Sequence, residues 1–186
     1  MAGNSAYYKD FREHLNALEK RGKLVRISRD INKDTELMPL VRWQFRGLDE
    51  HERKAFIFEN VIDSKGRRYN MPVTVGTLAA TTEIYAIGLM CEPDQIHERW
   101  TQAQLRPIEP VEVASAPVQE IVWQGRDLLN GHGLDMIPVP ISTPGFDNAP
   151  YLTSANWITK DVETGIYNIG NYRSQIKAPD RCGGFF

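Results

Sequence analysis

A short polar segment near the carboxyl end of the chain gathers residue types that can bind a ligand. Residues 168–175 read Asn-Ile-Gly-Asn-Tyr-Arg-Ser-Gln. The carboxamide oxygen of Asn168 suits a hard cation such as Mg²⁺ or Mn²⁺, and the planar guanidinium of Arg173 can grip a carboxylate or a phosphate at two points. Gly170 permits a close backbone approach or a β-bulge. Because polar groups are costly to bury without partners, a bound ligand is one way to satisfy them.

The segment lies within residues 166–177, which we predict to form a β-strand. In a regular strand Asn168, Gly170 and Tyr172 share one face, while Arg173 points to the other face about 16 Å along the strand. One site could use both ends if Gly170 forms a bulge, or if the ligand is as long as a flavin mononucleotide. The competing interpretation is a polar barrel strand with Arg173 in a surface ion pair.

The upstream sequence predicts a mixed α/β fold, because helical and extended patterns alternate along it. We expect helices at about 7–21, 35–48, 81–90 and 93–105, and strands at 24–27, 54–60 and 71–75. Asp34 and Thr81 are candidate N-caps, and Pro39 fits the first turn of the second helix. Such mixing indicates an α/β or α+β layer in which helices cover a small sheet.

Composition changes near residue 106, where three prolines enter and the helical period ends. We therefore predict a domain at 1–106, a proline-rich linker at 107–117 and a β-rich domain at 118–186. In the last region we expect strands at 118–123, 154–162 and 166–177, with a hairpin turn at 161–165. Residues 182–186, Cys-Gly-Gly-Phe-Phe, carry no polar tail. We expect an interrupted domain that continues in a longer parent or is completed by another chain.

Composition and motifs also exclude several classes of protein. The 186 residues include 24 acidic and 22 basic side chains, which argues against disorder and against a basic nucleic-acid scaffold. The longest apolar run, 84–91, is far short of the ~20 residues that cross a bilayer. Free thiols are the expected state of Cys91 and Cys182, and the cytoplasm is the default location. Phosphate-loop, nucleophile-elbow and zinc-helix motifs are missing. We expect a solvated surface position for all four histidines: His14, His51, His97 and His132.

The pattern Asn-x-Gly-x-Tyr-Arg-x-Gln at residues 168–175 resembles the cofactor motif of the UbiD-like decarboxylases. Residues 8–25 resemble the opening helix and strand of that family, and residues 56–89 resemble its next block. Residues 137–151, with Asp147 just before Ala149-Pro150-Tyr151, resemble the segment that leads into its cofactor domain. The resemblance covers essentially the whole chain and is most specific at the terminal motif.

This resemblance implies an N-terminal α/β domain followed by the start of a split β-barrel that binds prenylated FMN (prFMN). The implied activity is that of a carboxy-lyase, the reversible non-oxidative decarboxylation of an aromatic or α,β-unsaturated carboxylic acid, with Mn²⁺ or Mg²⁺ and K⁺ as further cofactors. Asn168 would coordinate the divalent ion at the cofactor phosphate. Asn171, Tyr172 and Arg173 would line the flavin, and Arg173 would also orient the substrate carboxylate. Asn171 departs from the aliphatic residue often found at its position.

The family's second metal ligand, its proton-transferring glutamates and its C-terminal domain would lie beyond Phe186. We therefore expect this chain alone to be catalytically incomplete and to bind the cofactor weakly or not at all. The full-length form would be a homo-oligomer with no nucleic-acid or membrane partner. Two alternatives stay open: a non-catalytic flavin-binding or assembly subunit related to the family, and a generic flavin or phosphate binder.

Overall fold

The computed structural model describes residues 7–184, which form two compact units. The first unit contains residues 7–29, Leu40–Asn60 and Pro72–Pro117, and the second contains Asp30–Pro39, Val61–Met71 and residues 118–184. Two segments from the predicted N-terminal domain thus group with the C-terminal residues, whereas the limits 1–106, 107–117 and 118–186 stay a prediction. The aromatic pair at the expected interrupted end, Phe185 and Phe186, lies outside the described residues.

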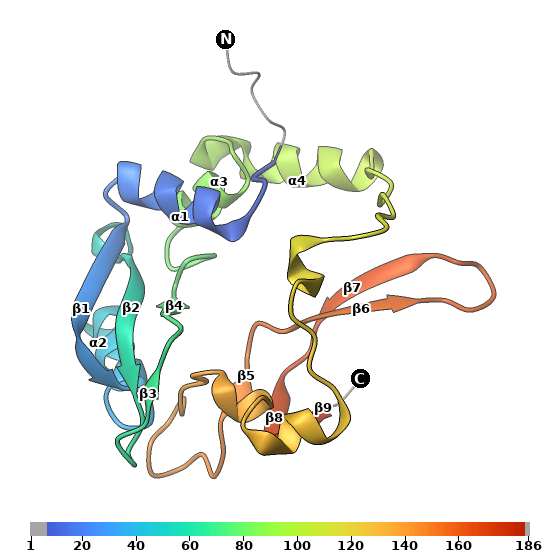
Figure 1. The fold of residues 1–186 in the computed structure, drawn as a ribbon. Helices are drawn as coiled ribbons and strands as arrows, with labels where there is room; N and C mark the ends of the chain where they lie inside the picture. Colours follow the sequence, from blue (N-terminus) through green and yellow to red (C-terminus); the bar gives the residue numbers. More distant parts are fainter. Residues whose placement is uncertain (1–6, 185–186) are drawn as a thin grey trace. The chain divides into compact units, whose positions relative to one another are not determined.

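The elements have the mixed character that the sequence predicts, and the α/β class is confirmed (Figure 1). The helices are α1 (Phe11–Lys20), α2 (Leu37–Gly47), α3 (Thr82–Gly88) and α4 (Ile96–Leu105), with 3₁₀ turns η1 (Glu50–Glu52), η2 (Pro93–Gln95), η3 (Pro117–Gln119), η4 (Gly125–Asn130) and η5 (Leu134–Met136). The strands are β1 (Leu24–Asn32), β2 (Ala55–Ile62), β3 (Arg68–Tyr69), β4 (Val73–Val75), β5 (Tyr151–Leu152), β6 (Asn156–Lys160), β7 (Tyr167–Asn171), β8 (Ser174–Ala178) and β9 (Arg181–Gly184). None of the helices within residues 7–184 combines the length and the apolarity needed to span a bilayer.

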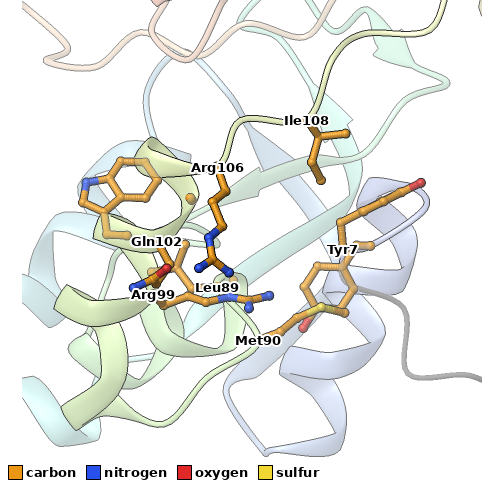
Figure 2. Close-up of a pocket in the computed structure, with 11 residues that line it drawn as sticks. Tyr7, Leu89, Met90, Arg99, Gln102, Arg106 and Ile108 are labelled. Atoms are coloured by element: carbon orange, nitrogen blue, oxygen red, sulfur yellow. The ribbon is translucent and has the colours of Figure 1, made fainter.

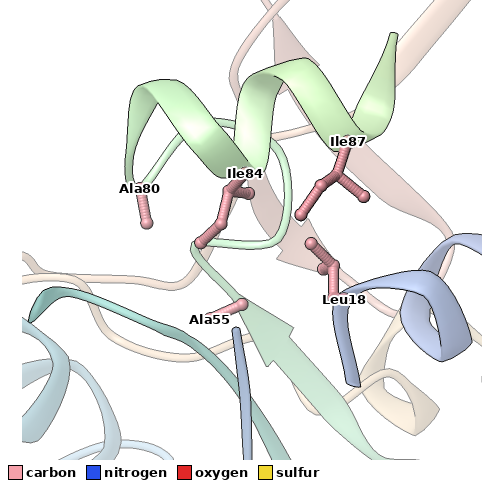
Figure 3. Packing of buried hydrophobic residues seen from close by; sticks show 5 residues of the cluster. All are labelled: Leu18, Ala55, Ala80, Ile84 and Ile87. Atoms are coloured by element: carbon pink, nitrogen blue, oxygen red, sulfur yellow. The ribbon is translucent and has the colours of Figure 1, made fainter. Parts of the chain in front are cut away.

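Helices α1 and α3 supply most of one apolar cluster in the first unit. The side chains in this cluster are Leu18, Ala55, Ala80, Ile84 and Ile87 (Figure 3). Leu18 and Ile84 are fully buried, and burial of each such side chain contributes about 1.5–3 kcal/mol to folding.

Side-chain caps determine where α1 and α3 begin. The Oδ1 of Asp10 accepts the N–H of Glu13 at 2.9 Å, so α1 starts at Phe11 and the predicted start at residue 7 was wrong. The Oγ1 of Thr81 accepts the N–H of Ile84 at 3.0 Å, which confirms Thr81 as an N-cap.

One histidine is part of this interior, so the expected surface position of His14 was wrong. Its side chain lies on the inner face of α1, where the ring Nε2 is 2.7 Å from the carbonyl oxygen of Thr77. The ring also packs against Tyr8 and Phe11. The contact with the Thr77 carbonyl gives Nε2 a partner, whereas the buried Nδ1 has no hydrogen-bond partner among residues 7–184.

The four-stranded sheet has the order β1-β2-β3, and β4 also pairs with β2. The division into units falls within β1 and β2. Strand β4 pairs antiparallel with the part of β2 that belongs to the first unit, with Phe56 opposite Val75. Strand β3 pairs antiparallel with the part that belongs to the second unit, with Val61 opposite Tyr69. The predicted strand, turn, strand arrangement is therefore confirmed.

The start of α2 differs from the prediction. The Oδ1 of Asn32 accepts the N–H groups of Asp34 and Thr35, at 2.9 Å and 3.2 Å, in a turn that precedes the helix. Helix α2 therefore begins at Leu37, Asp34 is not its N-cap, and Pro39 lies in its first turn as predicted.

The second unit contains a three-stranded sheet in the order β5-β8-β9 and the two-stranded β6-β7 hairpin. Its N-terminal segments contact its C-terminal loops: Arg67 pairs with Asp135 at 3.0 Å, and the N–H of Ile141 donates to the carbonyl of Lys33 at 3.2 Å. The predicted strand at 118–123 was wrong. This stretch continues from η3 as irregular chain, because its exposed apolar side chains find no neighbouring strand among residues 7–184.

Candidate functional site

The polar segment singled out in the sequence begins on the β6-β7 hairpin. The two strands are antiparallel, with Thr159 opposite Asn168 and Asn156 opposite Asn171. At the turn, the Oδ1 of Asp161 accepts the backbone N–H of Thr164 at 2.6 Å and that of Glu163 at 2.9 Å. These hydrogen bonds, those from Thr164 foremost, hold the pKa of Asp161 below its ordinary value. The predicted hairpin is confirmed.

The predicted single strand over residues 166–177 is instead two strands that belong to different sheets. Strand β7 ends at Asn171 and pairs with β6, whereas β8 begins at Ser174 and pairs with β5 and β9. Tyr172 and Arg173 form the connection between the two sheets. Ser174 is fully buried, and its Oγ donates to the carbonyl of Tyr172 at 3.3 Å. The motif therefore lies at a corner where the chain passes from one sheet to another.

Gly170 does not form the β-bulge that the sequence allowed, and instead leaves space for a neighbouring side chain. The pairing between β6 and β7 passes Gly170, opposite Trp157, without a register shift. A Cβ at position 170 would collide with the aromatic ring of Tyr172. The indole N–H of Trp157 donates to the carbonyl of Tyr172 at 3.2 Å. The missing side chain at position 170 thus makes room for the Tyr172 ring.

The strand register separates two of the predicted cofactor-binding residues. Because side chains alternate along a strand, Asn168 and Gly170 lie on one face with Trp157. Asn171 lies on the opposite face of the hairpin. The structure therefore brings Asn168 and the Tyr172 ring to one side and does not place Asn171 there.

The polar side chains of the motif face solvent. Asn168, Asn171 and Arg173 are exposed, and within residues 7–184 their side chains make no hydrogen bond or ion pair with the protein. The alternative of a surface ion pair at Arg173 was therefore wrong. The carboxamides and the guanidinium remain available to an external ligand.

The donor types fit a phosphate-bearing cofactor held through a divalent ion. The amide oxygen of Asn168 is a neutral hard ligand, and Mg²⁺ or Mn²⁺ needs only one or two protein ligands when phosphate oxygens complete its shell. The described part of the chain contains no group of three or more His, Cys, Asp or Glu side chains arranged to hold a metal. Asn168 could thus act as one ligand of an ion whose anionic ligands come from the cofactor or from other residues.

Trp157 and Thr159 were not identified from the sequence as neighbours of the motif at 168–175. Both share the face of Asn168, and Trp157 also hydrogen-bonds the corner. The signal was present only in part, because symmetric pairing about the predicted turn at 161–165 places Trp157 opposite Ile169, one residue from its observed partner, Gly170.

Two family models match the chain. Residues 15–104 match the 3-octaprenyl-4-hydroxybenzoate carboxy-lyase N-terminal domain, and residues 109–186 match the Rift-related domain of the same carboxy-lyase. The matched regions together span most of the chain, and the second includes the whole of the motif at 168–175.

Solved structures of UbiD-class enzymes resemble the chain over nearly its full length. HmfF from Pelotomaculum thermopropionicum, in an evolved dimeric form in complex with prFMN, is 29% identical with a TM-score of 0.76 over 94% of this chain and 38% of that chain. Vanillic acid decarboxylase from Sedimentibacter hydroxybenzoicus is 25% identical with a TM-score of 0.77 over 95% of this chain and 36% of that chain. The 3,4-dihydroxybenzoic acid decarboxylase of Klebsiella pneumoniae, 21% identical with a TM-score of 0.80 over 96% of this chain and 37% of that chain, shows the same fold.

The chain spans less than two fifths of the length of these enzymes. The N-terminal and Rift-related matches and the structural similarity nevertheless agree with the motif at the sheet corner. The chain belongs to the UbiD family of decarboxylases.

Proposed function

We propose that this chain provides the N-terminal α/β domain and the cofactor-binding corner of a prFMN-dependent decarboxylase. The reaction is the reversible, non-oxidative decarboxylation of an aromatic or α,β-unsaturated carboxylic acid. The observation that carries the proposal is the corner between β7 and β8, which contains Asn168, Tyr172 and Arg173. At this corner the ring of Tyr172 occupies the space next to Gly170. When bound, prFMN supplies the electrophilic flavin on which the carboxylic acid reacts.

Each motif residue has a role that follows from its chemistry. The amide oxygen of Asn168 binds the Mn²⁺ or Mg²⁺ that holds the cofactor phosphate. The Tyr172 ring, held against Gly170, offers a flat surface to the flavin. The guanidinium of Arg173 receives the substrate carboxylate through two parallel hydrogen bonds. Asn171, on the other face of the hairpin, reaches the flavin only if the cofactor also contacts the hairpin edge.

The proposal extends to the setting of the enzyme. The two free thiols, Cys91 and Cys182, fit a reducing cytoplasm. The full-length form acts as a homo-oligomer with K⁺ as a further cofactor, and the acid that protonates the product comes from residues outside this chain. No nucleic acid or membrane takes part.

The test combines cofactor binding with turnover. The full-length parent and the 186-residue chain are each mixed with prFMN, Mn²⁺ and K⁺, and visible absorbance and CO₂ release from aromatic and α,β-unsaturated acids are measured. We expect CO₂ release from the parent with prFMN and none with plain FMN. Binding by the parent without turnover on any acid would favour the flavin-carrying subunit. Equal affinity for plain FMN without a metal requirement would favour a generic flavin binder.

A further inference from the structure

A groove in the first unit is lined by residues that the proposed function does not use (Figure 2). It is open to solvent, with a volume of about 670 Å³, and lies between the segment that precedes α1, the end of α3, and α4 with the residues after it. The side chains that the argument uses are those of Tyr8, Met90, Arg99, Trp100 and Arg106. We call this hollow the arginine groove. Its volume is in the range of small-molecule sites.

Positive charge converges on the arginine groove. In Figure 2 the guanidinium groups of Arg99, on α4, and Arg106, just after it, both point into the hollow. None of the residues that line the groove is an aspartate or a glutamate. Within residues 7–184 the side chain of Arg106 has no hydrogen-bond or ion-pair partner, and only its backbone N–H donates, to the carbonyl of Gln102 at 3.0 Å. Two guanidinium groups in one hollow attract an anionic group that can contact both of them.

The surroundings strengthen this charge. An adjoining hollow shares Arg99 with the groove and adds Lys20 and Arg21. The one carboxylate that lines the adjoining hollow, Glu92, lies 3.7 Å from a guanidinium nitrogen of Arg21. The chain as a whole has a net charge of −2, so composition does not account for this local excess of cations. The helix dipole favours Lys20 and Arg21 at the carboxyl end of α1 and Arg106 at the carboxyl end of α4. It does not account for Arg99, which lies near the amino end of α4, where a cation is disfavoured.

The backbone at Met90 gives a second, independent indication of a binding site. Met90 is the one non-glycine residue with a positive φ, 55°, in the part of the chain that the structure describes. It directly follows Leu89, the C-cap of α3, at a position where glycine adopts this conformation without strain. The chain instead places a methionine side chain there, and that side chain lines both hollows. Strained backbone that persists in a hollow is a feature of ligand sites.

Aromatic side chains complete the apolar wall. Tyr8 is held in place because its hydroxyl donates to the carbonyl of Ile87 at 2.7 Å. Trp100 is half exposed at the groove. With Met90, these rings form a surface on which a flat apolar body can pack.

We propose that the arginine groove binds a small organic anion in which a carboxylate or a phosphate is joined to an apolar, preferably aromatic, body. Arg99 and Arg106 bind the anionic group, and Met90, Tyr8 and Trp100 contact the apolar body. The proposal is independent of the proposed decarboxylase function, because every residue of the groove belongs to the first unit and none belongs to the motif at 168–175.

The test measures binding of three probes to the 186-residue chain by titration calorimetry and by NMR of the tryptophan indole N–H groups. The probes are benzoate, acetate and inorganic phosphate. We expect saturable benzoate binding that is tighter than that of acetate and phosphate, with a shift of the Trp100 indole signal. The Trp43 signal, from an exposed tryptophan on α2, should stay in place.

Variants connect the binding to the groove. The double variant R99Q/R106Q should weaken benzoate binding at least about tenfold, since each guanidinium contributes charge-assisted hydrogen bonds. Arg46→Gln removes the same charge from an exposed position on α2 and serves as the matched control. Met90→Gly should weaken benzoate binding without a loss of thermal stability, because glycine relieves the strain at this φ. Failure of benzoate to saturate the chain, equal binding of phosphate and benzoate, or equal effects of R99Q/R106Q and R46Q would each overturn the proposal.

Discussion

The aromatic ring of Tyr172 occupies the space that a Cβ would fill at Gly170. Gly170 is the last residue but one of β7, and Tyr172 is the first residue of the connection from β7 to β8. The carbonyl of Tyr172 also accepts hydrogen bonds from the indole of Trp157 and the hydroxyl of Ser174. The corner that carries the family motif is therefore held by packing and hydrogen bonds that exist without any cofactor.

Gly170→Ala tests this packing. A methyl group at position 170 would overlap the Tyr172 ring, so the ring or the strand must move. We expect a loss of about 1–3 kcal/mol in the free energy of unfolding, as for other overpacked sites. Urea denaturation followed by tryptophan fluorescence measures it. The loss should shrink in the Tyr172→Ala background, where the ring is absent.

Gly47→Ala is the matched control for this substitution. Gly47 ends α2, has ordinary backbone angles and has open space around its Cβ position. Alanine there should leave stability unchanged or raise it by up to about 1 kcal/mol. Similar losses at positions 47 and 170 would contradict a specific role of the Tyr172 ring.

The Asp161 turn gives the hairpin a predictable dependence on pH. Hydrogen bonds from Thr164 and Glu163 lower the pKa of Asp161 below its ordinary value of 3.8. A carboxylate whose pKa is depressed in the folded state contributes stability above the unfolded pKa, and the contribution is lost as the pH falls through the folded pKa. The hairpin should therefore be most ordered above about pH 4–5 and should loosen in stronger acid.

NMR of the Thr164 amide between pH 7 and pH 2 measures this effect. Asp161→Asn keeps the shape of the side chain and removes its charge, so the acid-dependent change at Thr164 should disappear in the variant. An acid transition that survives unchanged in Asp161→Asn would assign the effect to other groups.

Gln44 connects α2 to the start of β2 through both ends of its amide. Its Nε2 donates to the carbonyl of Lys54 at 2.7 Å, and its Oε1 accepts the Lys54 N–H at 3.0 Å. Gln44→Ala leaves both backbone groups without their partner and should cost about 1–3 kcal/mol of unfolding free energy. Thermal and urea denaturation measure the cost. Gln104→Ala, at an exposed position on α4, should change stability by less than about 0.5 kcal/mol.

Local signals in the sequence predicted that the helices and strands of the first unit exist, although not where α1 and α2 begin, and they were insufficient where distant segments decide. The Thr81 cap and the turn at 161–165 were predictable because the residues that hydrogen-bond are three or fewer positions apart. The burial of His14 was not, because its partner, Thr77, is far along the chain. The grouping of Asp30–Pro39 with the second unit depends likewise on tertiary contacts such as that between Lys33 and Ile141.

In the candidate site, too, local sequence predicted some features, and long-range strand pairing determines the others. The residue types at 168–175 predicted the family, which the match over residues 109–186 confirms, whereas their ligand roles stay a prediction. The break between β7 and β8 was not predictable from a period-two pattern, since the alternation of side chains continues through Tyr172 and Arg173. Only the pairing of β8 with β5 and β9 shows that the chain changes sheets at this point. The arginine groove was missed because Arg99 and Arg106 belong to no recognisable sequence motif.

Asn168→Ala tests the proposed metal ligand. If the amide oxygen holds the divalent ion at the cofactor phosphate, its removal should lower prFMN occupancy in the full-length parent, measured by visible absorbance at limiting Mn²⁺. Excess Mn²⁺ should restore part of the occupancy, because the remaining ligands still bind the ion weakly. Asn156→Ala, on the opposite face of the same hairpin, is the control. Unchanged occupancy in Asn168→Ala would remove Asn168 from the metal site.

Arg173→Lys tests the proposed carboxylate clamp in the full-length parent. Lysine keeps the positive charge but replaces the planar fork with a single ammonium group, so bidentate binding is lost. Since hydrogen bonds to charged groups contribute about 1.5–3 kcal/mol, kcat/KM should fall roughly 10- to 100-fold. Arg173 has no ion pair within residues 7–184, so its replacement should leave the unfolding free energy unchanged. Arg181→Lys, at an exposed arginine 3.4 Å from Asp180, supplies the matched control and should retain full turnover. Near-normal kcat/KM in Arg173→Lys, with the cofactor fully bound, would show that the guanidinium does not orient the carboxylate.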